Sequence, residues 1–281
     1  MSGNVELLDL LKNSGDDEAV LDLKILEEEF EGKDLETAVK RRAEGEPLAY
    51  ILGYRHFYKE CYKVRPGVLI PRADTETVVE SALKFLGIND MATGDLLNIP
   101  SYGNELTDIR FADFCTGTGC IGISVANEIV RKGGRAECYL VDISDTAIET
   151  AAANVESQAL RPEFINVMKY DVTCKAPDIG KLDFIVSNPP YITNKEMTEL
   201  DKVVRDYEPD LALRAGDDGL DFYHPILESA IELLKDGGAL IVEHGYGQGT
   251  PVREVFAQGG LKKCMTIRDY GGNDRVTIGF K

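Results

Sequence analysis

The sequence Asn-Pro-Pro-Tyr lies directly after a short apolar run and has the residue types of a reactive turn. The run FIVS at positions 184–187 is typical of a buried strand, and it is followed by Asn188, Pro189, Pro190 and Tyr191. Consecutive prolines fix φ and lack backbone N–H groups, so a strand ladder cannot continue through them. We therefore expect a stiff turn that presents an amide side chain, free carbonyl groups and an aromatic ring.

Such a turn suits an acceptor nitrogen that is planar and carries two hydrogens, as in a carboxamide or an adenine amino group. The side-chain carbonyl of Asn188 and the main-chain carbonyl of Pro189 can each accept one N–H and orient the nitrogen for attack on a methyl group. Tyr191 offers a flat ring to the acceptor's π face. We expect Asn188, Pro189 and Tyr191 to be catalytic, and the whole turn, Pro190 included, to bind the acceptor.

A glycine-rich segment, DFCTGTGCIG at positions 113–122, predicts a nucleoside-binding loop. Gly117, Gly119 and Gly122 satisfy the pattern G-x-G-x-x-G, and Asp142 ends the next expected strand about 20 residues later. Glycines let the backbone approach a ligand, the following helix presents free N–H groups, and a carboxylate can accept from a ribose diol. A dinucleotide and S-adenosylmethionine both suit this geometry.

Two further strand ends narrow the choice of cofactor. Asp171 and Val172 end the third expected strand, where a carboxylate can bind the adenine amino group and an apolar side chain can cover the ring. The Asn-Pro-Pro-Tyr turn ends the fourth strand, where ligands of open parallel sheets collect. A methyl donor explains both features, whereas a dinucleotide leaves the turn unexplained.

The elements that must position these residues follow an α/β pattern. Apolar strands are expected at 109–115, 136–143, 163–172, 182–188 and 238–245, with helical stretches such as 120–133 and 144–158 between them. This alternation predicts a mostly parallel sheet with helices on both faces. Residues 264–281 predict two strands joined by a Gly-Gly-Asn-Asp turn, an antiparallel pair that closes one edge.

The first 80 residues differ from the rest and predict a small helical domain. Helical spacing predicts core contacts for Leu7, Leu8, Leu11, Val20, Leu23, Ile25, Leu26 and Phe30. Residues 57–64 and 68–70, around Pro66-Gly67, predict a short β-hairpin that links two domains. Asp74 or Thr75 can cap the next helix. Residues 87–108 lack periodicity and are expected to form a surface loop or insertion, whose role the sequence leaves open.

Composition excludes several classes of protein. The chain has 281 residues, of which 43% are hydrophobic and 28% charged, enough for one large and one smaller domain. It has no apolar run near the roughly 18 residues that span a membrane, and its polar N-terminus is unlike a signal peptide. Six cysteines without a C-x-x-C pair indicate reduced thiols in a cytoplasmic protein, and no metal site is expected. A net charge of −18 disfavours nucleic acid as the substrate.

The sequence resembles the peptide chain release factor glutamine N5-methyltransferases over nearly its whole length. The resemblance rests on PLAYILGYRHFY, VLIPRADTE, TGTGCIGI, VDIS, FIVSNPPYI, YEPDLAL, VEHGYGQG and RDYGGNDRVTIG. It implies a class I, Rossmann-like methyltransferase with a mostly parallel seven-stranded sheet at 81–281 and a helical substrate-binding domain with a hairpin linker at 1–80. It also implies methylation of the glutamine side-chain amide in the Gly-Gly-Gln motif of class 1 release factors.

The resemblance also assigns residues. S-adenosylmethionine would bind Cys115, Thr116, Gly117, Thr118, Gly119, Asp142, Asp171, Val172 and Asn188, and leave as S-adenosylhomocysteine. The helical domain would help to hold the release factor, and Arg41, Arg42, Arg55 and Arg72 are candidates to contact an acidic partner surface. The sequence departs from the family at three positions: Cys115 replaces the first glycine of the loop, Val172 replaces a residue that is often aromatic, and Ala73 replaces a proline.

Two other functions share parts of these patterns. A DNA adenine-N6 methyltransferase has the same turn and flips a base to reach it, but it needs a target-recognition region and a basic face. A non-catalytic partner protein that binds S-adenosylmethionine needs only the pocket. His224 and His244 are expected to have packing or capping roles, because the mechanism needs no histidine base. The sequence does not determine the oligomeric state or which release factor is preferred.

Overall fold

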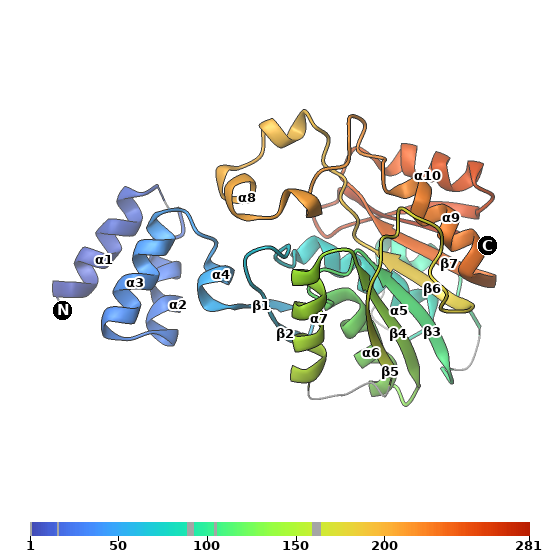
Figure 1. Cartoon of the computed structure of the whole chain (residues 1–281), viewed down its shortest axis with the longest axis horizontal. Helices are drawn as coiled ribbons and strands as arrows, with labels where there is room; N and C mark the ends of the chain where they lie inside the picture. Colours follow the sequence, from blue (N-terminus) through green and yellow to red (C-terminus); the bar gives the residue numbers. More distant parts are fainter. Residues whose placement is uncertain (1, 16, 89–92, 104–105, 159–163) are drawn as a thin grey trace.

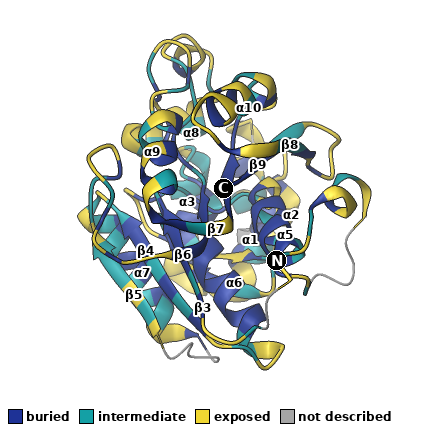
Figure 2. Ribbon diagram, turned by 90° about the vertical axis from the view of Figure 1, so that its right-hand side faces the viewer, coloured by how far each residue is buried: buried dark blue, intermediate teal, exposed yellow. Residues whose placement is uncertain are grey.

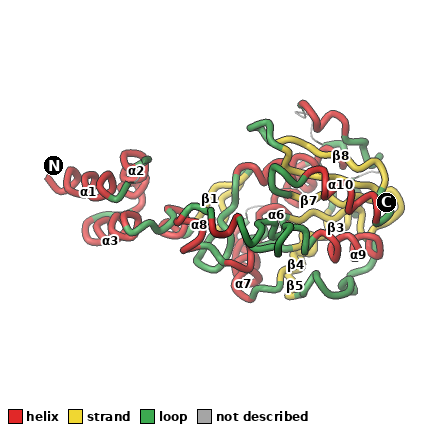
Figure 3. The backbone as a smooth tube through the Cα atoms, turned by 90° about the horizontal axis from the view of Figure 1, so that it is seen from above, coloured by secondary structure: helices red, strands yellow, loops and turns green. Residues whose placement is uncertain are grey.

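A computed structural model of the chain describes residues 2–15, 17–88, 93–103, 106–158 and 164–281. A group of helices at the N-terminus stands apart from a larger α/β body (Figures 1 and 3). Helices of the first part are α1 (Ser2–Asn13), α2 (Ala19–Glu29), α3 (Gly32–Ala43) and α4 (Leu48–Leu52). Helices of the body are α5 (Glu76–Phe85), α6 (Cys120–Arg131), α7 (Asp145–Ser157), α8 (Lys202–Tyr207), α9 (Tyr223–Leu233) and α10 (Gly249–Gln258).

The N-terminal helices have a small core of their own. Leu11, Leu23 and Leu26 are buried in it, as predicted. Val20, which the helical spacing also assigned to the core, is 64% exposed. The prediction was wrong because Asp22 takes a buried position on α2, where its carboxylate pairs with Arg42 of α3. The buried face of α2 therefore consists of Ala19, Asp22, Leu23 and Leu26, and Val20 lies beside this face.

The predicted β-hairpin is present but turns earlier in the chain. β1 (Tyr54–Phe57) pairs antiparallel with β2 (Glu60–Lys63), so the turn lies at Tyr58 and Lys59 and not at Pro66-Gly67. Tyr58 has a φ of 55°, the left-handed conformation that a tight turn requires. The aromatic residues at 57–64 were expected to lie on one strand. Phe57 lies on β1 and Tyr62 on β2, and their rings pack edge to face. Residues 64–72 then form an irregular connection.

Seven strands in the described residues form the central sheet. They are β3 (Ile109–Phe114), β4 (Ala136–Asp142), β5 (Phe164–Lys169), β6 (Leu182–Ser187), β7 (Leu234–Glu243), β8 (Lys262–Arg268) and β9 (Asp274–Phe280). Their order is β5-β4-β3-β6-β7-β9-β8, parallel from β5 to β7, with β9 antiparallel to both of its neighbours. The predicted mostly parallel sheet and its antiparallel closing pair are confirmed. Because β3 and β6 are adjacent, the strand order reverses between them, and ligands bind at such a point.

The two faces of the sheet build two cores. Phe111 and Phe184 face α5 and α6 with their rings stacked 4.6 Å apart, whereas Phe114 and Ile185 face the side of α9 and α10. This alternation along each strand is the pleat of a β-sheet. Figure 2 shows the central strands β3 and β6 in the colour of buried residues, and the edge strand β5 as partly exposed. The centre of the sheet is therefore a rigid base for the strand ends.

The segment after α5 packs on the body as an irregular loop with a short 3-10 helix, η2 (Gly94–Asn98). Leu96 and Ile99 are buried against the main core, and the hydroxyl of Tyr102 donates to Asp183 at 2.6 Å. Residues 89–92 and 104–105 of the predicted insertion lie outside the described residues. The division of the chain near residue 80 stays a prediction, and α5, which spans that residue, is buried against the sheet. Within the described residues, no helix has the length and apolar character to span a membrane.

Candidate active site

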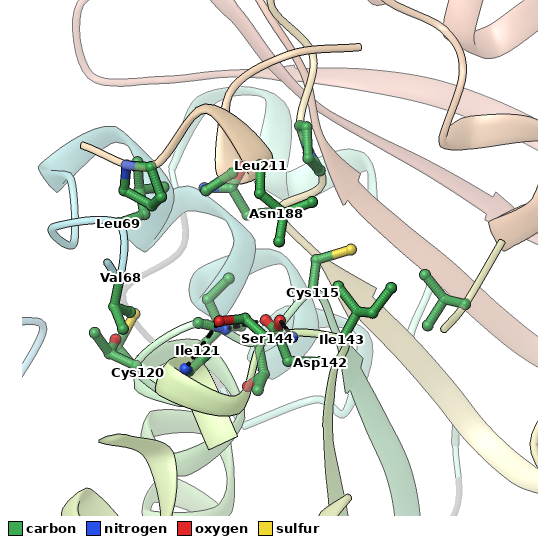
Figure 4. A pocket seen from close by; sticks show the side chains of 18 of the residues that line it. Val68, Leu69, Cys115, Cys120, Ile121, Asp142, Ile143, Ser144, Asn188 and Leu211 are labelled. Atoms are coloured by element: carbon green, nitrogen blue, oxygen red, sulfur yellow. Dashed lines mark hydrogen bonds between the residues drawn. The ribbon is translucent and has the colours of Figure 1, made fainter. Parts of the chain in front are cut away.

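A cavity of about 320 Å³ lies at the carboxyl ends of β3, β4 and β6. This volume falls in the range of small-molecule sites, roughly 300–1,000 Å³. Figure 4 shows Asn188 and Leu211 on one side of the cavity, Asp142 and Ser144 on the opposite side, and Val68 and Leu69 at a third. The strand ends therefore bring the predicted loop, the predicted ribose carboxylate and the Asn-Pro-Pro-Tyr turn to one place.

The loop after β3 is held from beneath by Asp113. Its carboxylate oxygen Oδ2 accepts from the Thr116 hydroxyl at 2.6 Å and from the backbone N–H of Gly122 at 3.0 Å. Burial raises the pKa of Asp113 to about 7, although both hydrogen bonds favour its charged form. The sequence analysis assigned Asp113 no role. Its position near the end of β3, four residues before Gly117, is the signal that could have identified it.

Cys115 has a left-handed backbone conformation, with a φ of 56°. A residue with a Cβ atom in this conformation costs roughly 1–2 kcal/mol, which glycine does not. This explains physically why the family's motif has glycine here. The thiol lines the cavity, and burial raises its pKa well above the ordinary value, so it remains a neutral group.

Asp142 is fixed by backbone N–H groups on both of its oxygens. Oδ2 accepts from Gly117 at 2.9 Å and Oδ1 accepts from Ser144 at 2.9 Å. Burial raises the pKa of Asp142, and the backbone N–H groups oppose that shift. Each carboxylate oxygen keeps a second lone pair, so a diol can still donate to both of them. This arrangement supports the predicted ribose contact.

The adenosine side of the cavity has the predicted acidic and apolar residues. Hydrogen bonds from Thr173 hold the pKa of Asp171 below its ordinary value, so the carboxylate is charged and can accept from an amino group. Val172 and Ile143 line the same cavity, and Ile143 is 44% exposed although it is apolar. Acceptors for a diol and an amino group beside an apolar surface fit an adenosine, so these residues fit S-adenosylmethionine.

Asn188 lines the cavity and is anchored through its nitrogen. Its Nδ2 donates to the Thr75 hydroxyl oxygen at 3.2 Å, which leaves Oδ1 available as an acceptor. Thr75 was expected to cap α5, but its side chain makes no capping hydrogen bond, and neither does that of Asp74. Thr75 has a helical backbone conformation, with φ −65° and ψ −20°, because the 3-10 helix η1 (Ala73–Thr75) continues into α5, whereas an N-cap is extended. Its side-chain partner Asn188 lies 113 residues further along the chain. Thr75 is therefore a site residue that the sequence analysis interpreted only as a cap.

The remaining residues of the turn differ in their relation to the cavity. Pro190 lines it, whereas Pro189 and Tyr191 do not. Among the described residues, none donates a hydrogen bond to the carbonyl of Pro189, which agrees with the predicted free acceptor. The Tyr191 hydroxyl donates to Glu243 at 3.2 Å, and burial raises the pKa of Tyr191, so the phenol stays protonated. Gly119, the helix cap behind the loop, also lies outside the cavity lining.

An ion pair joins two segments that line the cavity. Glu208, whose side chain is 2% exposed, accepts from the Arg72 guanidinium and from the backbone N–H of Ile70. The residues that line the cavity beside this pair come from two segments: Gly67, Val68, Leu69, Pro71 and Arg72 from one, and Pro209, Leu211 and Ala212 from the other. Of the arginines that were candidates for an acidic partner, Arg72 therefore pairs within the chain, as do Arg41 with Glu46 and Arg42 with Asp22. Three of the four candidates are thus paired within the chain, whereas Arg55 on β1 is exposed.

The predicted packing role of His244 agrees with its surroundings. It is fully buried, and its ring nitrogens contact the Gly245 carbonyl at 2.9 Å and the Thr277 hydroxyl at 3.0 Å. Burial lowers its pKa, which favours the neutral ring. No group of three or more His, Cys, Asp or Glu side chains suited to a metal ion occurs in the described part of the chain.

Gly119 and Gly133 form a matched pair that tests the loop. Both have left-handed φ values, 82° and 80°. A Cβ atom on Gly119 would lie 2.9 Å from Ile123 Cδ1, whereas one on Gly133 would meet nothing within 4 Å. We expect Gly133→Ala to lose about 1 kcal/mol of folding free energy from backbone strain alone. Gly119→Ala should lose about 1–3 kcal/mol more from overpacking and bind S-adenosylmethionine more weakly.

Denaturant unfolding and calorimetric titration of the two glycine variants measure this difference. Equal losses of stability, together with unchanged affinity for S-adenosylmethionine in both variants, would show that the packing behind the loop does not position it.

Comparisons with known proteins give the relatives of this chain. Residues 90–206 match the model of the family described as "Methyltransferase small domain". The release factor glutamine methyltransferase of Haemophilus influenzae is 36% identical over 250 residues, which cover 88% of this chain and 80% of that protein. The enzyme of the same name from Neisseria gonorrhoeae is 38% identical over 240 residues, covering 85% of this chain and 78% of that protein.

Solved structures support the fold. The catalytic domain of hMettl16, solved with an RNA hairpin, aligns with a TM-score of 0.55 at 15% identity and covers 88% of this chain and 79% of that one. The 16S rRNA methyltransferase RsmC of T. thermophilus, solved with AdoMet and guanosine, aligns with a TM-score of 0.51 at 15% identity and covers 81% of this chain and 49% of that one. At such identities the likeness concerns the fold alone.

Proposed function

The chain belongs to the release factor glutamine methyltransferase family, and from this premise we propose that it methylates the N5 side-chain amide of the glutamine in the Gly-Gly-Gln motif of class 1 peptide chain release factors. The observation that supports this most directly is the position of Asn188. It lines the same cavity as Asp142, and its amide nitrogen is bound to Thr75 so that its oxygen is available to an amide N–H.

The cavity would bind S-adenosylmethionine along the carboxyl ends of β3 and β4. When it is bound, this molecule supplies an electrophilic methyl group on a sulfonium and leaves as S-adenosylhomocysteine. Asp142 would accept from the ribose hydroxyls, and Asp171 from the adenine amino group. Val172 and Ile143 would cover the ring. Carboxylates that line the cavity also favour a ligand that carries positive charge.

The turn at the end of β6 would hold the glutamine. Asn188 Oδ1 and the Pro189 carbonyl would each accept one N–H of the carboxamide, which fixes the nitrogen and favours a more tetrahedral geometry as it attacks. Tyr191 would support the plane of the amide, although its own hydroxyl is bound to Glu243. The nitrogen becomes acidic as it gains the methyl group, so its surplus proton can pass to water without a general base.

The helical N-terminal domain would help to hold the release factor. It has its own core and stands apart from the body in Figure 1, on the side where the hairpin joins the two parts. The hairpin in turn is bound to the body, because Asn154 of α7 bridges both backbone groups of Lys63 and the Thr118 carbonyl of the loop. A partner held by the helices would therefore have a fixed relation to the cavity.

A methyl-transfer assay with labelled S-adenosylmethionine tests the function. A purified class 1 release factor and unmethylated duplex DNA are offered separately, and the products are mapped by mass spectrometry of peptides and nucleosides. We expect one methyl group, on the glutamine of the Gly-Gly-Gln motif, and none in DNA. Label in DNA alone would establish the adenine-N6 alternative, and transfer to neither would leave a non-catalytic partner protein.

A further inference from the structure

Glu243 is a buried carboxylate beside the turn that the mechanism above does not use. It ends β7, the strand next to β6, so it lies at the same edge of the sheet as Asn188. The residue is 1% exposed. Its Oε2 atom is fully buried and accepts no hydrogen bond of standard geometry from any described residue. A buried carboxylate with an unsatisfied oxygen is costly, and it calls for an explanation.

Both polar side chains of the turn lead to this carboxylate. The Tyr191 hydroxyl donates directly to Glu243 Oε1 at 3.2 Å. Asn188 is linked to it through one residue. Its Nδ2 donates to the Thr75 oxygen at 3.2 Å, and the Thr75 side chain lowers the pKa of Glu243 against the effect of burial. The Glu243 carboxylate is therefore linked to both ends of the turn, to Tyr191 directly and to Asn188 through Thr75.

The direction of these hydrogen bonds follows from the chemistry of the groups. The Thr75 oxygen already accepts from Asn188, so the hydrogen of its hydroxyl is free to be donated to the Glu243 carboxylate. An ionised carboxylate can only accept, so it requires Thr75 to donate. Thr75 must then use a lone pair for Asn188, and this keeps the amide nitrogen inward and Oδ1 toward the cavity. A protonated acid or an amide at position 243 could donate to Thr75 and would remove this constraint.

We propose that the ionised side chain of Glu243 is a positioning residue, which fixes the orientation of the Asn188 amide through Thr75 and of Tyr191 directly. This inference rests on the proposed function, because it assigns the role of Asn188 Oδ1 to binding the acceptor amide. Glu243 itself does not touch the substrate. It sets which end of the Asn188 amide faces the cavity.

Charged and titratable groups from several elements face Glu243. Burial raises its pKa to about 7, while Thr75, Arg275 of β9 and Tyr191 favour the charged form and Asp74 opposes it. The Tyr223 hydroxyl of α9 donates to the Glu243 backbone carbonyl. Burial raises the pKa of Cys120 of α6, and the negative charge of Glu243 adds to this shift. The positioning role requires the charged form, so kcat is expected to fall as pH decreases through about 7.

Substitutions at 243 and 75 test the proposal in the full-length enzyme. We expect Glu243→Gln and Thr75→Val to lower kcat for the release factor about 10- to 100-fold and to leave the Kd for S-adenosylmethionine within about twofold. Thr75→Ser keeps the hydroxyl and should restore most of kcat. Thr77→Val is the matched control, because the Thr77 hydroxyl is also buried on α5 and has no hydrogen-bond partner among the described residues.

The pH profile and a double-mutant cycle separate positioning from a structural role. The decrease of kcat below about pH 7 should be smaller in Glu243→Gln than in the wild type. Asp113, whose pKa is also about 7, is present in both proteins, so the difference between the two pH profiles reports Glu243. Because Glu243 acts through Thr75, Thr75→Val combined with Glu243→Gln should lower kcat no more than the larger single effect.

The effect of the Glu243 charge on thermal stability is expected to have the opposite pH dependence to its effect on kcat. The pKa of Glu243 is raised from 4.5 to about 7 on folding, so its contribution to stability is fully present below about pH 4.5 and is lost as the pH rises through about 7. Glu243→Gln avoids that loss, and its Tm relative to the wild type should rise between pH 5 and pH 8. A purely structural glutamate would instead lose Tm and activity together.

Defined outcomes would overturn the proposal. Wild-type kcat in Glu243→Gln, an unchanged acid limb in that variant, or additive effects in the cycle would each refute it. If Glu243→Gln does not fold, as shown by lost binding of S-adenosylmethionine, the Thr75 variants still test the proposal. A kcat of Thr75→Val equal to that of Thr75→Ser or Thr77→Val would refute it. An inactive wild-type enzyme would refute the proposed function instead, because the proposal about Glu243 concerns only differences from an active wild type.

Discussion

Asn188→Ala is expected to lower kcat for methylation of the release factor about 100- to 1,000-fold, the range found when one preorganised transition-state contact is removed. The alanine cannot accept an N–H of the glutamine amide, so the nitrogen loses one of the two contacts that fix it. The Kd for S-adenosylmethionine should change little, because Asp142 and the loop at 115–118 remain. Single-turnover kinetics and calorimetric titration of the same preparation measure the two quantities.

Asn194→Ala serves as the control for this experiment. Asn194 is an exposed asparagine six residues later, and its side chain contacts Asp217 and Arg214 outside the cavity. Its substitution should leave kcat nearly unchanged. If Asn188→Ala retained kcat within a few-fold of the wild type, the acceptor would bind elsewhere and the turn would be structural.

Asp142→Asn is expected to weaken binding of S-adenosylmethionine about 10- to 100-fold. Hydrogen bonds to a charged acceptor are worth roughly 1.5–3 kcal/mol, and each 1.4 kcal/mol is tenfold in Kd. The variant also has a single acceptor oxygen for Gly117 and Ser144, whose N–H groups now bind separate oxygens. The loop should therefore lose part of its support as well as the ribose contact. Titration calorimetry of the apo protein measures Kd directly.

Asp145→Asn is the matched control for Asp142→Asn. Asp145 begins α7 only three residues later, but its side chain is 74% exposed and pairs with Lys169 at the surface. Exposed pairs contribute about 0–1 kcal/mol, so this variant should bind S-adenosylmethionine like the wild type. Equal weakening in both variants would mean that general charge, and not a directed contact, attracts the ligand.

The sheet and the strand-end residues could be predicted from the sequence because both depend on local patterns. Phe111 and Phe184 alternate with Ala112 and Ile185, which signals strands with two buried faces. Because these strands are parallel, their carboxyl ends lie at one edge of the sheet. Asp142 and Asn188 each stand at such an end in the sequence, so their place at this edge could be predicted. The cavity therefore contains most of the expected cofactor residues.

The residues that the sequence did not predict act over long distances in the chain. Thr75 and Asn188 are 113 residues apart, and the Arg72 ion pair with Glu208 spans 136 residues. A threonine before a helix also has a common local role as a cap, and this local interpretation prevailed. Glu243 gave only the weak signal of a carboxylate at the end of a strand. Its relation to Asn188 depends on the adjacency of β6 and β7, which chain order alone does not fix.

The order of the last strands has a consequence for synthesis on the ribosome. β9 follows β8 in the chain but lies between β7 and β8, and its Arg275 faces Glu243. A chain that emerges from its N-terminus can fold helices α1 to α3 early, because those helices have their own core. β7, however, stays an unpaired edge until residues 274–280 emerge, and open edges are prone to pair with other chains. Slow translation of the segment between β7 and β9 would prolong the interval in which nascent chains can aggregate.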